Sequence, residues 1–101
     1  MDSTYKAVMI RPTDNVATAM ENIPANATVT LTCQDKTVSV VVKRDIEFGH
    51  KFAIMLISKE TNIVKYGEVI GRAVQDIEPG EHVHIHNIEG IRGRGDRVGI
   101  N

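Results

Sequence analysis

The fold class is decided by residues 27–42, ATVTLTCQDKTVSVVV. The first half alternates threonine with the apolar residues Val29, Leu31 and Cys33. Successive side chains of a strand point to opposite faces, so the threonines should face solvent and the apolar residues the core. The polar residues 34–36 then favour a turn into a second strand. The segment therefore predicts a β-hairpin.

Short apolar segments on both sides of the hairpin predict further strands, separated by polar or glycine-containing turns. They cover residues 5–10, 51–57, 62–66, 69–74 and 82–88. One segment has a different period: Asp14 can cap a helix whose apolar stripe runs from Val16 to Ile23 and ends before Pro24. The expected fold is mostly β, a single domain with one short helix.

A corner sequence recurs between the expected strands. Residues 23–26 (IPAN), 46–49 (IEFG) and 77–80 (IEPG) place Asn or Gly three positions after an isoleucine, and residues 57–60 (ISKE) begin in the same way. Asn and Gly tolerate positive φ, so the pattern predicts tight turns whose isoleucine is buried. The irregular spacing argues against a solenoid and for corners of one small β-domain.

Composition limits the classes of protein to consider. The chain has 101 residues, 42% hydrophobic, and a formal net charge of −1, which predicts one modest core and no general attraction to nucleic acid or anionic membranes. The apolar runs are too short to span a membrane, and the N-terminus lacks a signal pattern, so a cytoplasmic location is expected. Cys33 is the only cysteine, which excludes an internal disulfide and predicts a buried apolar role.

Three of the four histidines lie in residues 80–87, GEHVHIHN. His82, His84 and His86 occupy alternate positions of an expected strand and should share one face, where two imidazoles can close on a metal ion. His82 lies nearest the turn and is expected to be a bystander. The same spacing is also typical of an exposed polar face.

Residues 90–101 differ from the rest because they are rich in glycine and arginine, so we expect a domain over residues 1–89 and a tail over 90–101. Guanidinium groups bind carboxylates in a bidentate manner, so the tail can contact an anion or a partner. A solvated, flexible tail is the alternative.

Five segments together resemble a known family: DNVA at 14–17, GHKFA at 49–53, VKYG at 64–67, IGRA at 70–73 and GEHVHIHN at 80–87. Their order and spacing resemble the N-terminal domain of altronate dehydratase, in a family that includes galactarate dehydratase and the two-subunit sulfolactate sulfo-lyases. The resemblance covers residues 5–88. It implies a SAF domain with the β-clip fold that is shared with antifreeze-like domains.

The resemblance implies part of an enzyme. Because the family's dehydratases have a much longer catalytic region, the implied partner is a separate large subunit, and the chain is expected to be the small subunit of a hydro-lyase that converts a sugar acid to a 2-keto-3-deoxy acid. The implied cofactor is a divalent metal, iron or manganese, bound by the chain or only together with the large subunit. The alternatives are a non-catalytic sugar-acid-binding or assembly module, and the small subunit of a sulfolactate sulfo-lyase.

Dehydration of a hydroxy acid requires acid and base groups, and a metal stabilises the charge that develops beside the carboxylate. His50, His84 and His86 are the expected catalytic residues, with His84 and His86 as metal ligands. For His50, capping a turn is the alternative. The residues expected to bind substrate are Lys51, Arg72, Arg92 and Arg94. Exposed strand edges also make a homo-oligomer an expectation.

Overall fold

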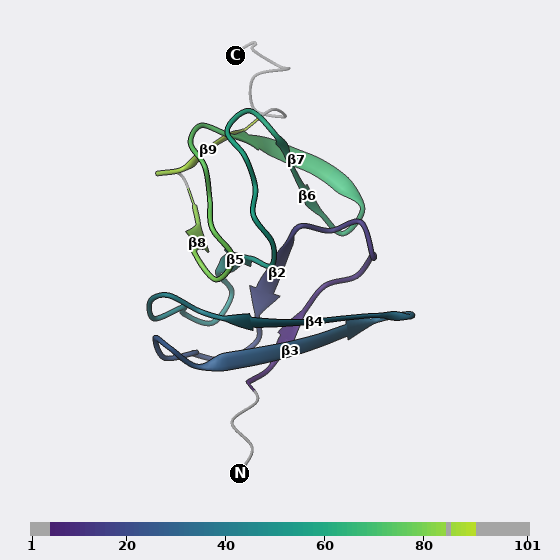
Figure 1. Ribbon diagram of the computed structural model, residues 1–101, viewed down its shortest axis with the longest axis vertical. Coiled ribbons are helices and arrows are strands. Elements are labelled where there is room, and N and C mark those ends of the chain that lie inside the picture. Colours follow the sequence, from purple (N-terminus) through teal and green to yellow (C-terminus); the bar gives the residue numbers. More distant parts are fainter. Residues whose placement is uncertain (1–4, 85, 91–101) are drawn as a thin grey trace.

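The strands form three layers, which Figure 1 shows in a computed structural model that describes residues 5–84 and 86–90. The strands in the described part are β1 Ala7–Val8, β2 Val16–Ala19, β3 Thr28–Cys33, β4 Lys36–Val41, β5 Lys51–Ala53, β6 Asn62–Lys65, β7 Glu68–Ala73, β8 His82–Val83 and β9 Ile88–Gly90. The predicted mostly-β fold is confirmed.

The middle layer is an antiparallel sheet with the strand order β1-β2-β5-β8. The β3–β4 hairpin lies on one side of it, and the β6-β7-β9 sheet lies on the other (Figure 1). Ala17 and Phe52 pack into a core with the hairpin, whereas Val16 and Ala53 pack into a second core with β6 and β7. The direction of a side chain in the middle layer therefore decides which outer layer it meets.

The hairpin has the predicted alternation. Its register runs from Thr28 opposite Val41 to Cys33 opposite Lys36. In β3 the apolar positions are buried and the threonines are exposed, as predicted. Cys33 is a buried free thiol whose Sγ donates to the Ile10 carbonyl at 3.1 Å.

The predicted short helix is wrong, because Val16–Ala19 forms strand β2 between β1 and β5. All four residues of β2 are buried, so the strand lacks the alternation that would have distinguished it from a helix. No helix occurs in residues 5–84 or 86–90, and the described segments accordingly include no helix long and apolar enough to cross a membrane.

Asp14 does not cap a helix but joins two loops. Its carboxylate accepts hydrogen bonds from the backbone N–H groups of Ile10, Arg11 and Gly67 at 3.0, 3.2 and 2.8 Å. Burial raises the pKa of Asp14, but these bonds outweigh burial and hold its pKa below the ordinary value of 3.8. Ionised Asp14 therefore ties the loop before β2 to the β6–β7 turn.

The three corners predicted from Asn or Gly are confirmed, residues 57–60 form a fourth corner although they lack the glycine, and the four pair in space. Ile23 bridges Ile46 in a first corner pair, and Ile57 bridges Ile77 in a second. Each isoleucine is at most 1% exposed. The fourth residue of every corner has positive φ: 72° at Asn26, 88° at Gly49, 74° at Glu60 and 86° at Gly80.

The two corner pairs differ in the hydrogen bonds that flank them. In the first pair, the Asn22 and Asp45 side chains each accept a backbone N–H from the opposite corner at 2.9 Å. In the second pair, Asp76 accepts one such bond at 2.8 Å. The second such bond is missing in this pair. Leu56 stands where the first pair has Asn22 and offers no acceptor, and Pro79 stands where the first pair has Phe48 and has no backbone N–H to donate.

Candidate functional site

Two of the corners lead directly to the histidines. Gly49 and Gly80 turn the chain into β5 and β8, which pair antiparallel with Phe52 opposite His82. His50 precedes Phe52 by two residues and therefore points to the same face as His82. The pairing of two strands that are distant in sequence thus brings the two imidazoles together.

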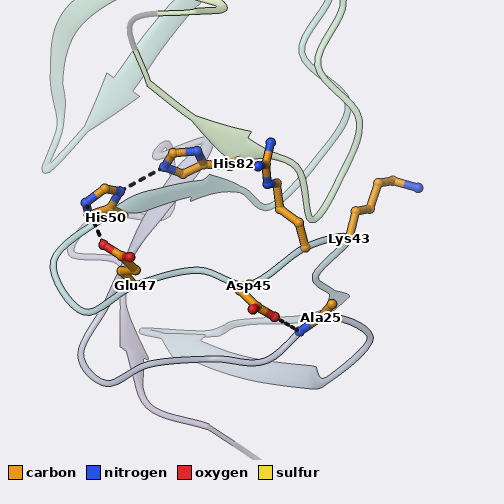
Figure 2. A pocket seen from close by; sticks show the side chains of 7 residues that line it. Ala25, Lys43, Asp45, Glu47, His50 and His82 are labelled. Atoms are coloured by element: carbon orange, nitrogen blue, oxygen red, sulfur yellow. Dashed lines mark hydrogen bonds and ion pairs between the residues drawn. The ribbon is translucent and has the colours of Figure 1, made fainter.

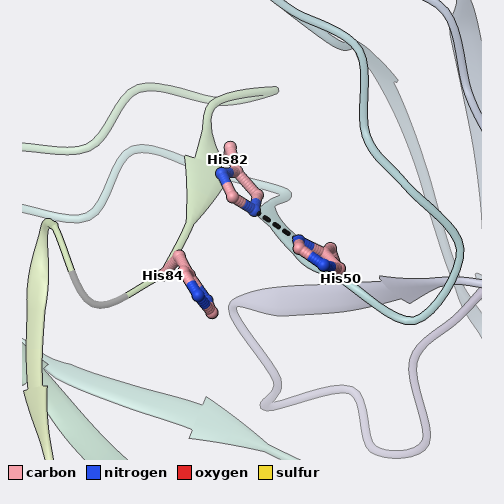
Figure 3. Close-up of side chains that lie close together, drawn as sticks. All are labelled: His50, His82 and His84. Carbon is pink, nitrogen blue, oxygen red and sulfur yellow. Dashed lines mark hydrogen bonds between the residues drawn. The ribbon is translucent and has the colours of Figure 1, made fainter.

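Three imidazoles form one cluster (Figure 3). His50 Nδ1 and His82 Nε2 are 2.9 Å apart, within hydrogen-bonding distance. The ring centroids of His84 lie 5.4 Å from those of both His50 and His82, and one nitrogen of each ring lies within 4.8 Å of the others. His82, the expected bystander, lies beside His50 because β8 pairs with β5, and its role stays a prediction.

A turn that is held by Asn87 determines the positions of His84 and His86. Strand β8 ends at Val83, so the strand predicted over residues 82–88 is two short strands around a turn. Asn87 is fully buried; its Oδ1 accepts from the His84 N–H at 2.9 Å, and its Nδ2 donates to the His82 carbonyl at 2.8 Å. This turn leaves His84 and His86 exposed, with the His86 ring centroid 5.6 Å from that of His82.

His82 is held in its neutral form. Burial, followed by the nearby His50, His84, His86 and Arg44, lowers the pKa of His82 from 6.5 to about 4. A neutral imidazole keeps a lone pair that can accept a proton or bind a metal. At neutral pH, His82 is therefore a lone-pair donor at the centre of the cluster.

The cluster borders an open cavity of about 560 Å³ (Figure 2). Its lining residues are Ala25, Lys43, Arg44, Asp45, Glu47, His50 and His82. Glu47 Oε1 lies 3.7 Å from His50 Nε2. The cavity thus joins the imidazoles to charged groups from the segment that follows β4.

Arg44 lines this cavity and is a candidate anion-binding residue that was not predicted from the sequence. Lys43 is already ion-paired with Glu78 at 3.2 Å, and Asp45 accepts a corner hydrogen bond. In the described part of the chain, the Arg44 guanidinium has no ion-pair partner, although it lies close enough to His82 to lower its pKa. It is available to bind an anion beside the imidazoles.

Lys51 and Arg72, two of the residues predicted to bind substrate, do not line this cavity. Lys51 lies opposite Val83 and therefore faces away from His50 and His82. Arg72, on β7, donates from Nε to Glu89 at 2.9 Å, so an anion would compete with that pair. Arg92 and Arg94 lie outside the described residues, as does the tail beyond Gly90. All four roles stay predictions.

The donor set suits a divalent transition metal. His50, His82 and His84 supply three imidazole nitrogens, which iron, manganese and zinc all accept. Metal–nitrogen bonds of about 2.0–2.1 Å require the rings to move closer together. The group differs from the predicted ligand pair by containing His50 and His82 in place of His86.

The chain belongs to the family of altronate/galactarate dehydratase SAF domains, which it matches over residues 5–90. It is 40% identical over 80 residues to altronate dehydratase of Escherichia coli (strain K12), an alignment that covers 79% of this chain and 15% of the relative. The chain therefore spans less than a sixth of the dehydratase length. The family predicted from sequence is confirmed.

The chain also matches (2R)-sulfolactate sulfo-lyase subunit alpha. It is 46% identical over 56 residues to this subunit of Chromohalobacter salexigens, covering 55% of this chain and 60% of the relative. The subunit of Paracoccus pantotrophus is 39% identical over 57 residues, covering 56% of this chain and 85% of the relative. The relatives are thus lyases, and two of them are subunits of which the aligned region covers 60% and 85%.

Proposed function

We propose that the chain is the small subunit of a hydro-lyase that dehydrates a sugar acid of the altronate or galactarate class to a 2-keto-3-deoxy acid. A separate large subunit completes the enzyme. The observation that carries the proposal is a cluster of three imidazoles beside an open cavity, whose lining includes Arg44 with no ion-pair partner among the described residues. The two sulfo-lyase alpha subunits support a role as a small subunit, and the family supports a lyase.

Each group of the cavity has a part in this chemistry. Arg44 binds the substrate carboxylate and fixes the carbon beside it near the imidazoles. A divalent metal held by His50, His82 and His84 would supply positive charge where negative charge develops next to the carboxylate.

His86 then remains as the imidazole able to move a proton, because it is exposed and stacks on His82 without joining the ligand group. Glu47 Oε1 lies 3.7 Å from His50 Nε2 and can help to orient this ring. A cytoplasmic location and self-association stay predictions.

The test is a reconstituted enzyme. The tagged chain is co-purified from its host with any larger subunit, loaded with Fe²⁺ or Mn²⁺, and assayed for keto-acid formation from altronate and galactarate. We expect turnover only from the complex, with large losses in Arg44→Met and His86→Ala and none in the control Lys59→Met. A complex that turns over normally without Arg44 and His86 contradicts the site.

The second candidate is the small subunit of a sulfolactate sulfo-lyase, which the coverage of the alpha subunits favours. The same complex distinguishes the two, because it would release sulfite from (2R)-sulfolactate and leave altronate unchanged. A binding module is the third reading. It predicts that histidine variants change ligand affinity or assembly while turnover by the large subunit is unaffected.

A further inference from the structure

A second group of polar residues lies on the opposite face of β5 from the histidines. Lys51 is opposite Thr18 of β2 in the middle sheet, so the two side chains point together toward the β6–β7 layer. The Tyr66 hydroxyl reaches Thr18 Oγ1 at 3.5 Å. The Lys65 ammonium lies 4.8 Å from the Tyr66 ring centroid. Four side chains from three strands and a turn thus meet at one place.

Two ammonium groups lie near one another at this place. Lys51 and Lys65 are both partly buried, and burial followed by the charge of Lys65 lowers the pKa of Lys51. No hydrogen bond or ion pair of the Lys51 ammonium falls within residues 5–84 and 86–90. Burying a charge without a partner is unfavourable, so Lys51 is positioned for a counter-charge that comes from outside this part of the chain.

The residues that surround Lys51 and the β6–β7 turn differ in charge. The Arg11 side chain lies against Gly67, close enough for its Cγ to be 3.0 Å from a Cβ built there. Val83, opposite Lys51 on β8, is apolar and fully buried. The carboxylate on the β6–β7 hairpin is Glu68, which is opposite Lys65 and is exposed.

Tyr66 is held in an uncommon backbone conformation. Its φ is 57°, and the following Gly67 has a φ of 77°, the combination of a tight hairpin turn. Tyrosine rarely adopts positive φ, and such strain is concentrated where a side chain must be held in place. Here the turn keeps the hydroxyl on Thr18 and the ring beneath Lys65.

We propose that Lys51, Lys65 and the hydroxyls of Tyr66 and Thr18 form a carboxylate-binding site, separate from the histidine cavity. The ammonium groups attract a carboxylate, and the hydroxyls can bond its oxygens or a neighbouring alcohol. The carboxylate can belong to a free hydroxy acid or to an acidic side chain of a partner. The site does not depend on the proposed lyase activity.

The experiment follows the backbone amide resonances of the full chain by NMR, without metal or partner. The probes are sodium altronate, a short glutamate peptide, and the uncharged polyol sorbitol. We expect saturable shifts at Thr18, Lys51, Lys65 and Tyr66 with one or both carboxylates and none with sorbitol. Altronate alone identifies a hydroxy-acid site, and the peptide alone identifies a site for a partner's acidic residue.

Two variants decide whether Lys51 is responsible. Lys51→Met keeps the aliphatic length and should weaken binding by about tenfold or more, the loss expected for a charged hydrogen bond. Lys59→Met, at an exposed corner, should leave affinity unchanged. The proposal is overturned if neither carboxylate gives saturable shifts at these residues, or if Lys51→Met binds as tightly as the parent chain. These readings do not change if the chain proves not to be a lyase subunit.

Discussion

Gly49 and Gly80 occupy equivalent corners, each one turn before a histidine strand, yet their surroundings differ. Their φ values are nearly the same, 88° and 86°. A Cβ at Gly49 would have no heavy atom within 4 Å, whereas a Cβ at Gly80 would lie 2.0 Å from the Val41 carbonyl oxygen. At Gly49 only the local backbone conformation favours glycine, whereas at Gly80 the close packing of β4 also excludes a side chain.

The Gly80 corner also holds the parts of the site together. The Gly80 N–H donates to the Ala53 carbonyl, and the Gly80 carbonyl accepts from the Lys43 N–H, at 2.8 and 2.9 Å. These bonds connect the start of β8 to β5 and to the segment that carries Arg44. A corner of the fold therefore also fixes the distance between His82 and the cavity wall.

The largest effect is expected for Gly80→Ala. Positive φ and the contact with Val41 together should lower the free energy of unfolding by about 3 kcal/mol, because a backbone segment must move. Urea denaturation followed by circular dichroism measures the loss. A value near that of Gly49→Ala would show that the close approach of β4 does not matter.

An intermediate effect is expected for Asn87→Ala, which acts just beyond the Gly80 corner. Both side-chain hydrogen bonds of this buried residue disappear, leaving the His84 N–H and the His82 carbonyl unpaired, so we expect a loss of about 2 kcal/mol. Histidine ring NMR signals should shift at His84 and His86. Unchanged signals would contradict the role of Asn87 in placing them.

For Gly49→Ala we expect a loss of about 1 kcal/mol, since the backbone strain acts without a clash. The same denaturation measurement applies, and Gly90→Ala is a control at a glycine that also has no heavy atom near a built Cβ. A loss equal to that of Gly80→Ala would contradict the claim that close packing makes the Gly80 corner more sensitive to substitution than the Gly49 corner.

The smallest expected effect is a pH dependence of the free energy of unfolding that comes from His82, which the pairing of β5 with β8 places beside His50. The folded pKa of His82 is about 4 and the ordinary value is 6.5, so the unfolded chain binds more protons between these values. The free energy of unfolding is therefore highest above pH 6.5 and decreases as the pH falls toward 4. The expected decrease is about 1 kcal/mol after allowance for solvent screening. His82→Gln should flatten this part of the stability curve, and an unchanged curve would show that His82 is not its source.

Sequence alone predicted the parts of the fold that rest on local patterns. The alternation of β3 and the recurring isoleucine corners follow from side-chain period and positive φ, which neighbouring residues determine. Strand β2 could not be recognised, because a strand buried on both faces has no polar alternation. Its spacing matched a helix equally well.

The candidate site was predictable only in part. The histidines were visible as a cluster of residue types, but the place of His82 depends on the pairing of β5 with β8, which are about thirty residues apart. Arg44 belongs to no recognisable motif, and only its position in the cavity indicates a functional role. Lys51 is adjacent to His50 in sequence and faces away from it in the sheet.

The most direct test of the account is a calorimetric titration of the full chain with Zn²⁺, used as a probe for imidazole ligands. We expect binding that weakens by about tenfold or more in each of His50→Ala, His82→Ala and His84→Ala, and that stays unchanged in Lys59→Met. Wild-type affinity in His82→Ala, or no binding by the parent chain, would contradict the claim that the two corners bring these histidines together as one metal site.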